Sequence, residues 1–207
     1  MLQIKALPLG AYQTNCYIVF EEQSKTCAVI DPGYEPAVIL DTVRALGLRV
    51  EAILLTHGHF DHVGAVESIV KATGCKLWMA QSDYTQFQNP QNDFYYPIHD
   101  CSFTEVWFCQ DQDEISAGGL TFSVLATPGH TYGSVCYLCE NALFSGDTLF
   151  AGSCGRTDLP GGDWAAIKQS LERLSELEED FTVFPGHGPA TTLAEEYMLS
   201  TLAFKYL

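Results

Sequence analysis

The sequence carries at residues 56–62 the stretch Thr-His-Gly-His-Phe-Asp-His, which places three imidazoles and one carboxylate within six consecutive positions. The apolar residues 52–55 precede it and predict a short buried strand, and residues 63–73 predict a helix that ends at Gly74. The stretch is therefore expected on a strand-to-helix loop, where a rigid scaffold holds functional side chains beside an open cleft.

The spacing within this loop indicates metal binding. His57 and His59 point the same way in an extended segment, because side chains alternate with a period of two, so both can hold one metal ion. Asp61 and His62 fall at the turn into the helix and point elsewhere, which suits a second metal ion beside the first. Imidazole and carboxylate ligands suit zinc, iron or manganese. A polar cluster without metal is the alternative, but three of only six histidines in the chain fall here.

Length and composition predict a single globular domain over residues 1–207, because 47% of the residues are hydrophobic and 17% are charged. The N-terminus shows no secretory signal, so the eight cysteines are expected as free thiols in a reducing cytoplasm. Cys136 and Cys139 form a Cys-x-x-Cys pattern, but residues 134–140 predict a strand, on which positions three apart face opposite sides. A redox or metal role for this pair is therefore not expected.

The formal net charge of -16 opposes binding to phosphate backbones, so DNA, RNA and anionic membranes are not expected as partners. No apolar run approaches the length of a transmembrane helix. We expect a cytoplasmic protein, a monomer or a small homo-oligomer, whose partner is a small molecule.

The pattern of apolar and turn residues predicts two strand-rich halves that each finish with helices. Strands are expected at residues 3–8, 14–21, 26–30, 52–55 and 76–80, and in a second set at residues 104–109, 120–126, 135–139, 142–145 and 182–184. Helices are expected at residues 36–46, 63–73, 164–178 and 193–204. Residues 82–100, which include His99, predict a short helix and a long loop, and His99 is expected to have no functional role. This order suggests two sheets face to face with helices outside.

The second half of the sequence contains three further residues of types that bind metal ions. His130, Asp147 and His187 each follow an apolar strand and a glycine, where the backbone can turn sharply and aim a side chain off the end of the sheet. Five of the six histidines thus occupy one kind of position, which argues for one shared site.

Together these residues resemble the metallo-β-lactamase superfamily, through His57-x-His59-x-Asp61-His62, His130, Asp147 and His187 in the family's order. The resemblance implies an αββα sandwich with a dinuclear site at the sheet edges. It implies that one metal ion is held by His57, His59 and His130, and the other by Asp61, His62 and His187, with Asp147 as the bridge. Zinc is the expected metal, and iron and manganese are the alternatives.

Within the superfamily, residues 127–134 and 144–158 resemble the glyoxalase II (hydroxyacylglutathione hydrolase) branch, although persulfide dioxygenases carry similar segments. Longer glyoxalase II proteins add a C-terminal helical region that supplies basic contacts to glutathione. Here the chain ends 20 residues after His187, which resembles the short bacterial type.

The resemblance implies hydrolysis of a thioester of a small 2-hydroxy acid, such as an S-lactoyl thiol, by a metal-bound hydroxide. Asp61 is expected to handle the proton of the attacking water as well as to bind metal. The other enzyme classes left open are an iron-dependent persulfide dioxygenase and a lactonase or β-lactamase. A non-catalytic metal-binding protein is disfavoured because all seven ligands are present.

Arg156 is the only basic residue between Lys76 and Lys168, and it follows Asp147 by nine residues on a glycine-rich loop. It is expected to anchor a substrate carboxylate by a bidentate contact. A structural ion pair with Asp158 or Asp163 is the alternative.

Overall fold

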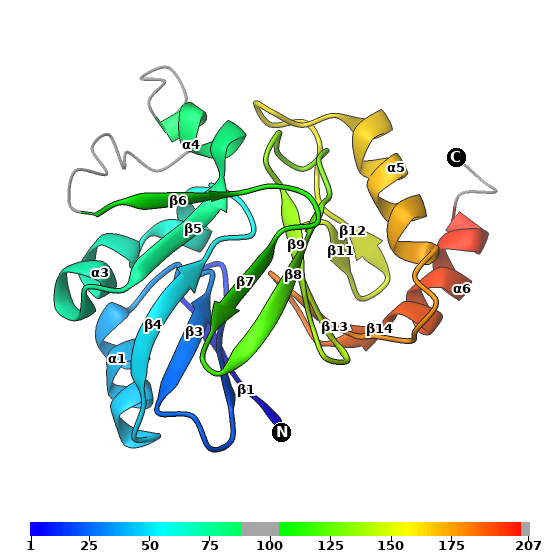
Figure 1. The fold of residues 1–207 in the computed structure, drawn as a ribbon. Helices are drawn as coiled ribbons and strands as arrows, with labels where there is room; N and C mark the ends of the chain where they lie inside the picture. The colour runs from blue at the N-terminus through cyan, green and yellow to red at the C-terminus, as the bar shows by residue number, and fades with distance from the viewer. Residues whose placement is uncertain (88–103, 204–207) are drawn as a thin grey trace.

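The computed structural model describes residues 1–87 and 104–203. The first half of the chain forms a six-stranded sheet in which the strands follow the order of the sequence (Figure 1). The first three strands are antiparallel and the last three continue parallel to the third. The strands are β1 (Leu2–Leu9), β2 (Thr14–Glu21), β3 (Thr26–Ile30), β4 (Arg49–Leu54), β5 (Lys76–Ala80) and β6 (Val106–Cys109).

The second sheet also has six strands, in the order β14-β13-β10-β9-β8-β7. Its strands are antiparallel except for the parallel pair β10 and β13. They are β7 (Glu114–Ala117), β8 (Leu120–Ala126), β9 (Val135–Cys139), β10 (Ala142–Gly146), β13 (Thr182–Pro185) and β14 (Thr191–Thr192). A separate hairpin joins β11 (Leu149–Phe150) to β12 (Ser153–Cys154).

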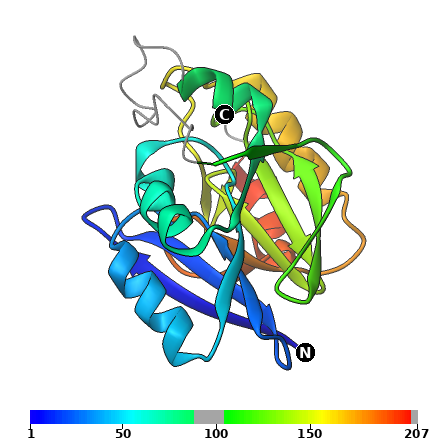
Figure 2. The same ribbon diagram turned by 60° about the vertical axis from the view of Figure 1, so that its left-hand side comes forward.

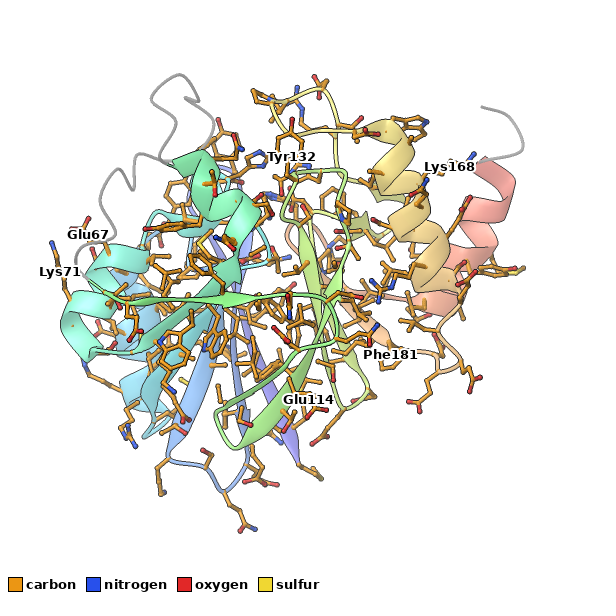
Figure 3. All side chains as sticks on the ribbon, turned by 45° about the horizontal axis from the view of Figure 1, so that its top comes forward. Glu67, Lys71, Glu114, Tyr132, Lys168 and Phe181 are labelled. Atoms are coloured by element: carbon orange, nitrogen blue, oxygen red, sulfur yellow. The ribbon has the colours of Figure 1, made fainter. Side chains whose placement is uncertain are left out.

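Helices cover the outer face of each sheet (Figures 1 and 2). The helices of the first half are α1 (Pro36–Ala45), α2 (Phe60–Val63), α3 (Val66–Thr73) and α4 (Gln81–Phe87), and those of the second half are α5 (Trp164–Ser175) and α6 (Leu193–Ala203). Exposed charged residues such as Glu67 and Lys71 on α3 and Lys168 on α5 lie on the outside of these layers (Figure 3). The αββα sandwich expected from the sequence is therefore confirmed.

Three separate cores hold the four layers together, because neighbouring residues of each strand face opposite sides. Val29 and Ile53 pack under α1 and α3, whereas their neighbours Ile30 and Leu54 face the second sheet. The core between the sheets also contains fully buried Phe122. The third core lies between the second sheet and the helices α5 and α6.

The same alternation places Cys136 and Cys139 of the Cys-x-x-Cys pattern on opposite sides of β9, as the sequence predicts. Cys136 belongs to the core under α5 and α6, and Cys139 belongs to the core between the sheets. Seven cysteines fall within the residues that the structure describes, and all seven are free thiols. No helix among the described residues is both long enough and apolar enough to cross a membrane.

Several expectations about the elements need correction. The strand expected at residues 104–109 belongs to the first sheet, because β6 pairs in parallel with β5 rather than with the strands that follow it. The helix expected at residues 63–73 is two helices, since α2 ends at Val63 and α3 begins at Val66. The short strands β7, β11, β12 and β14 were not expected. His99 lies outside the described residues.

Candidate metal centre

The predicted ligands come together because the strands that carry them end at one edge of the sandwich. His57 follows β4, His130 follows β8, Asp147 follows β10 and His187 follows β13. The two sheets also contact each other near this edge. The hydroxyl of Tyr137 on β9 donates a hydrogen bond of 2.8 Å to the backbone carbonyl of Leu55, which follows β4. Seven side chains that span 131 positions of sequence, from residue 57 to residue 187, thereby meet in one place.

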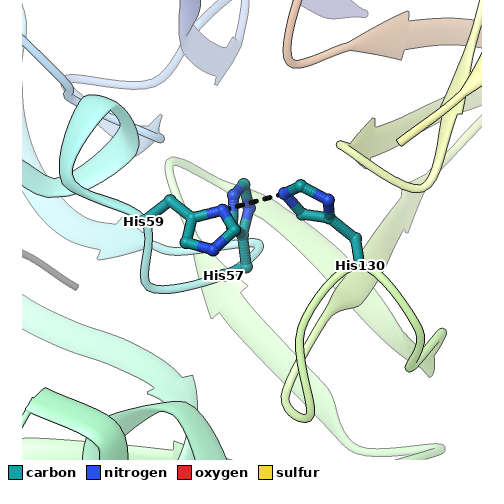
Figure 4. Close-up of side chains that lie close together, drawn as sticks. All are labelled: His57, His59 and His130. Carbon is teal, nitrogen blue, oxygen red and sulfur yellow. Dashed lines mark hydrogen bonds between the residues drawn. The ribbon is translucent and has the colours of Figure 1, made fainter. Parts of the chain in front are cut away.

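Among the described residues three groups of possible ligand atoms occupy this edge, and within each group the atoms lie within 4.8 Å of one another. Two of the groups have no side chain in common, and the third, Asp31, His57 and His62, shares one histidine with each of them. The first group is His57, His59 and His130 (Figure 4), and the second is Asp61, His62 and His187. Figure 4 shows the first group converging from two loops. The His59 Nδ1 atom lies 2.9 Å from the His130 Nε2 atom. These are the same two groups that the resemblance to the superfamily implies.

Asp147 lies between the two groups. Its Oδ1 atom is 3.4 Å from the Nε2 atom of His62, and its Oδ2 atom is 3.5 Å from that of His130 and 3.6 Å from that of His187. A carboxylate that reaches members of both groups has the position that a bridging ligand requires. The His/Asp clusters are thus consistent with a dinuclear metal site.

Hydrogen bonds on the far side of each ring fix which nitrogen faces the centre. The Nδ1–H groups of His62, His130 and His187 donate to the Asp31 carboxylate, the carbonyl of residue 156 and the carbonyl of residue 12, respectively. The acceptors hold the Nδ1 proton on the far side of each ring, so Nε2 faces the centre and offers its lone pair there when the ring is neutral. The rings are therefore oriented for coordination by the fold itself.

Asp31 is not one of the seven predicted ligands, but it orients two of them. Its carboxylate accepts from the backbone N–H of Thr56 at 2.8 Å, from the Thr56 hydroxyl at 2.6 Å and from His62 at 2.9 Å. Because the Thr56 hydroxyl donates to Asp31, it accepts from the Nδ1–H of His57, 3.1 Å away. Asp31, Thr56 and the two rings thus form one oriented network.

Two buried polar atoms show that the centre fits metal ions. The Nε2 atom of His57 and the Oδ1 atom of Asp147 have no hydrogen-bond partner among the described residues. A buried polar atom without a partner costs about 1–3 kcal/mol, so coordination of a cation would satisfy both. The glycine at position 186 also leaves room beside the Asp147 carboxylate, because a Cβ atom there would lie 2.2 Å from Asp147 Oδ1. The donor set of imidazoles and carboxylates suits divalent zinc, iron or manganese.

The first group is held in its neutral form. Burial lowers the pKa of His57 well below its ordinary value and lowers that of His59 to about 3. Burial also lowers the pKa of His130. These rings therefore offer lone pairs to a metal ion at neutral pH without first releasing a proton.

The second group behaves in the opposite way. Burial alone would lower the pKa of His62. The neighbouring Asp147 and Asp31 carboxylates together outweigh that effect, so the pKa of His62 lies well above its ordinary value. The pKa of His187 is also raised, because its hydrogen bond to Asp61 and the charge of Asp147 outweigh burial. For Asp61, burial raises the pKa, but the bond from His187 and the charge of His62 bring it below its usual range. A metal ion in this group must displace protons.

A pocket of about 490 Å³ opens over the centre. Its apolar wall is formed by Tyr12, Phe60, Phe150 and Leu159, and five of the seven predicted ligands form part of its floor. Arg156 also lines this pocket, and its guanidinium makes two hydrogen bonds of 2.7 Å to Asp158. The ion pair that the sequence offered as an alternative to substrate anchoring is therefore present.

Comparison with known proteins decides the family. The family model described as the metallo-beta-lactamase superfamily matches residues 9–187. The chain belongs to this superfamily. It is 34% identical over 202 residues to the hydroxyacylglutathione hydrolase GloC of Haemophilus influenzae, covering 94% of this chain and 95% of that protein.

Two solved structures are similar to this chain along almost their full length. The B3 metallo-beta-lactamase BLEG-1 has a TM-score of 0.84 and 34% identity, covering 95% of this chain and 97% of that one. TTHA1623, solved in a di-iron-bound form, has a TM-score of 0.79 and 36% identity, covering 93% and 96%. Family and site together make the chain a metallo-hydrolase of this superfamily.

Sequence reasoning missed three residues that support the centre: Asp31, Thr56 and Asp83. Asp31 directly follows the strand expected at residues 26–30, but unlike His130, Asp147 and His187 it has no glycine before it, so the ligand pattern did not include it. Thr56 was quoted but given no role. Asp83 has no signal in the sequence.

Proposed function

We propose that the protein hydrolyses thioesters of small 2-hydroxy acids, such as S-lactoyl thiols, at a centre of two zinc ions. The position of Asp147 between the two groups carries this proposal, because it makes a dinuclear site out of two clusters. The similarity to a hydroxyacylglutathione hydrolase over 95% of that protein's length supports the thioester as substrate. Iron or manganese are the alternative metals.

The side chains around the centre divide the work. Two divalent ions, when bound, lower the pKa of a water molecule and polarise the carbonyl oxygen of a substrate. The Asp61 carboxylate is ionised, because its pKa lies below the usual range, and it lines the pocket, so it can accept the proton of the attacking water. Thr14 donates to Asp61 Oδ2 at 3.1 Å and so fixes the direction of the carboxylate.

The apolar wall holds the substrate and excludes water. Tyr12 and Phe60 meet edge to face with their ring centroids 5.4 Å apart, which forms a firm surface on one side of the centre. Phe150 and Leu159 add further apolar surface to the same pocket, which suits a thioester with a small acyl group.

Arg156 is assigned the anchoring of a substrate carboxylate. Its ion pair with Asp158 is exposed, with 61% and 67% of the two side chains accessible. Exposed pairs contribute about 0–1 kcal/mol, so a substrate carboxylate can replace Asp158 at little cost. The guanidinium would then keep its bidentate geometry with a new partner.

The experiment is a hydrolysis assay on zinc-reconstituted protein, run in air and under nitrogen. S-lactoylglutathione and the S-lactoyl ester of the neutral thiol N-acetylcysteamine serve as substrates. We expect thioester cleavage at the same rate in both atmospheres. Absent thioester cleavage in both, together with iron-dependent oxygen uptake in the presence of a persulfide, would make the protein a dioxygenase instead.

Hydrolysis of β-lactams is the second candidate, and the similarity to the B3 metallo-beta-lactamase BLEG-1 favours it. The same zinc-reconstituted protein would be assayed with a penicillin and a carbapenem. A kcat/KM for either β-lactam above that for both thioesters would replace the first proposal by the second.

A further inference from the structure

Asp83 is a fully buried carboxylate that lies outside both ligand groups but contacts the loops that carry the first one. It lies on α4, which directly follows β5. Its Oδ2 atom accepts from the backbone N–H of Gly58 at 2.8 Å and from the Thr131 hydroxyl at 2.9 Å. Its Oδ1 atom accepts from the backbone N–H of Gly133 at 2.7 Å.

These three donors belong to two different loops. Gly58 lies between the predicted ligands His57 and His59, and Thr131 directly follows the predicted ligand His130. One loop follows β4 of the first sheet, and the other joins β8 to β9 of the second. One carboxylate thus joins the two segments that supply all three ligands of the first group.

Only a carboxylate satisfies this arrangement. All three partners donate, and an ionised aspartate is an acceptor at both oxygens. An asparagine of the same shape would turn its NH₂ group toward at least one of these donors. The fit is also tight, because a Cβ atom on Gly133 would lie 2.6 Å from Asp83 Oδ1.

The fold keeps this charge in spite of its burial. Burial raises the pKa of Asp83 to about 6, even though Thr131, Gly58 and Gly133 act to lower it. A buried carboxyl with a raised pKa is less stable when ionised than it would be in water. The three hydrogen bonds to the ligand loops, rather than this pKa, indicate what Asp83 does.

We propose that Asp83 is a positioning residue that sets the separation of the two ligand loops and thereby the affinity of the first group for its metal ion. This inference rests on the proposed metal centre, but it does not depend on which substrate is hydrolysed. Loss of the Asp83 contacts would loosen the His57–His59 loop from the His130 loop, leaving between them the backbone hydrogen bond from Val135 to Thr56 and the contact of the two rings. The second group has no hydrogen bond to Asp83 among the described residues.

The test measures metal affinity rather than turnover. Metal-free wild type and Asp83→Asn are titrated with Zn²⁺ against a competing chelator, and the two sites are assigned with His59→Ala and His187→Ala. We expect Asp83→Asn to weaken the first site at least fivefold and to leave the second site within twofold. A weakening of less than fivefold, or an equal loss at both sites, would overturn the proposal.

A matched control is Glu196→Gln. Glu196 is also a buried carboxylate that accepts from a backbone N–H and a threonine hydroxyl, those of Gly152 and Thr191. It lies outside both ligand groups, so we expect Glu196→Gln to leave both zinc affinities within twofold. A fivefold loss at the first site in this control would show that any buried carboxylate has the same effect, which would contradict the proposal.

If Asp83→Asn fails to fold, a milder pair of variants replaces it. Thr131→Val removes one donor to Asp83, whereas Thr131→Ser keeps the hydroxyl. We expect Thr131→Val to weaken the first site at least threefold relative to Thr131→Ser. Equal affinities in the two variants would overturn the proposal, and no result of the thioester assay would change this conclusion.

Discussion

The Nδ1 atom of His59 lies 2.9 Å from the Nε2 atom of His130, although the two residues are 71 positions apart and lie in loops of different sheets. In the metal-free protein one of these nitrogens must carry a proton for the contact to be a hydrogen bond. Both rings have lowered pKa values, so both remain neutral at pH 7. A metal ion bound by the first group would therefore replace the proton between these two nitrogens.

Replacement of His59 by alanine should remove the first metal ion and abolish turnover without unfolding the protein, because His59 lies on a loop rather than in a core. We expect the metal content to fall from about two ions per chain to about one. Elemental analysis and circular dichroism of the purified variant check this. An active wild-type preparation that contains no transition metal would contradict the whole assignment.

Asp61→Asn should lower kcat by about 10²–10⁴, the range typical of the loss of a general base. The amide keeps the shape of the side chain but can neither accept the water proton nor contribute charge to the second group. Thr14→Val is the milder comparison, because it removes only the hydrogen bond to Asp61. Unchanged kcat in Asp61→Asn with full metal content would rule out this role.

Metal binding by the second group should depend on pH, whereas binding by the first should not between pH 6 and 8. His62 has a raised pKa and must lose a proton before it coordinates, so affinity falls by about tenfold per pH unit below that pKa. His57 and His59 have lowered pKa values and are already neutral. Dialysis against buffered Zn²⁺ at pH 8, 7 and 6 should show loss of one ion first. Simultaneous loss of both ions would refute the prediction.

Arg156→Lys should raise KM about tenfold for a thioester that carries carboxylates, because a lysine cannot make the bidentate contact. Neither kcat nor the melting temperature should change, because the pair with Asp158 is exposed. Asp158→Asn should lower KM, since it releases the guanidinium for the substrate. A normal KM with lost stability in Arg156→Lys would show that the arginine is structural.

The sequence predicted the bounds of five strands, although the strand expected at residues 52–55 is β4 and begins earlier, at Arg49. The bounds expected for β2, β3, β5, β8 and β9 agree with the structure. The missed strands are shorter: β7 has four residues and β14 has two. At that length the period of two cannot be separated from chance, and pairing with a neighbouring strand decides the conformation.

The helix after the histidine loop shows a different limit. The apolar pattern of the sequence predicts one helix from Val63 to Thr73, but the helix is interrupted at Gly64 and resumes at Val66. A Cβ atom on Gly64 would lie 2.4 Å from the carbonyl oxygen of Gly33, so the absence of a side chain at Gly64 allows close contact with the loop after β3. That contact is tertiary, and no local pattern reveals it.

The sequence by itself determined the seven candidate ligands and the layered fold, because ligand chemistry and strand periodicity are local properties of residue type and spacing. Only the tertiary structure decided which atoms face the centre, that Arg156 pairs with Asp158, and that Asp31 and Asp83 support the ligand loops. The partners of a carboxylate come from segments far apart in the chain, such as Asp83 and Thr131, which are 48 positions apart. These contacts depend on how the two sheets pack, and the spacing of residues along one segment does not reveal that packing.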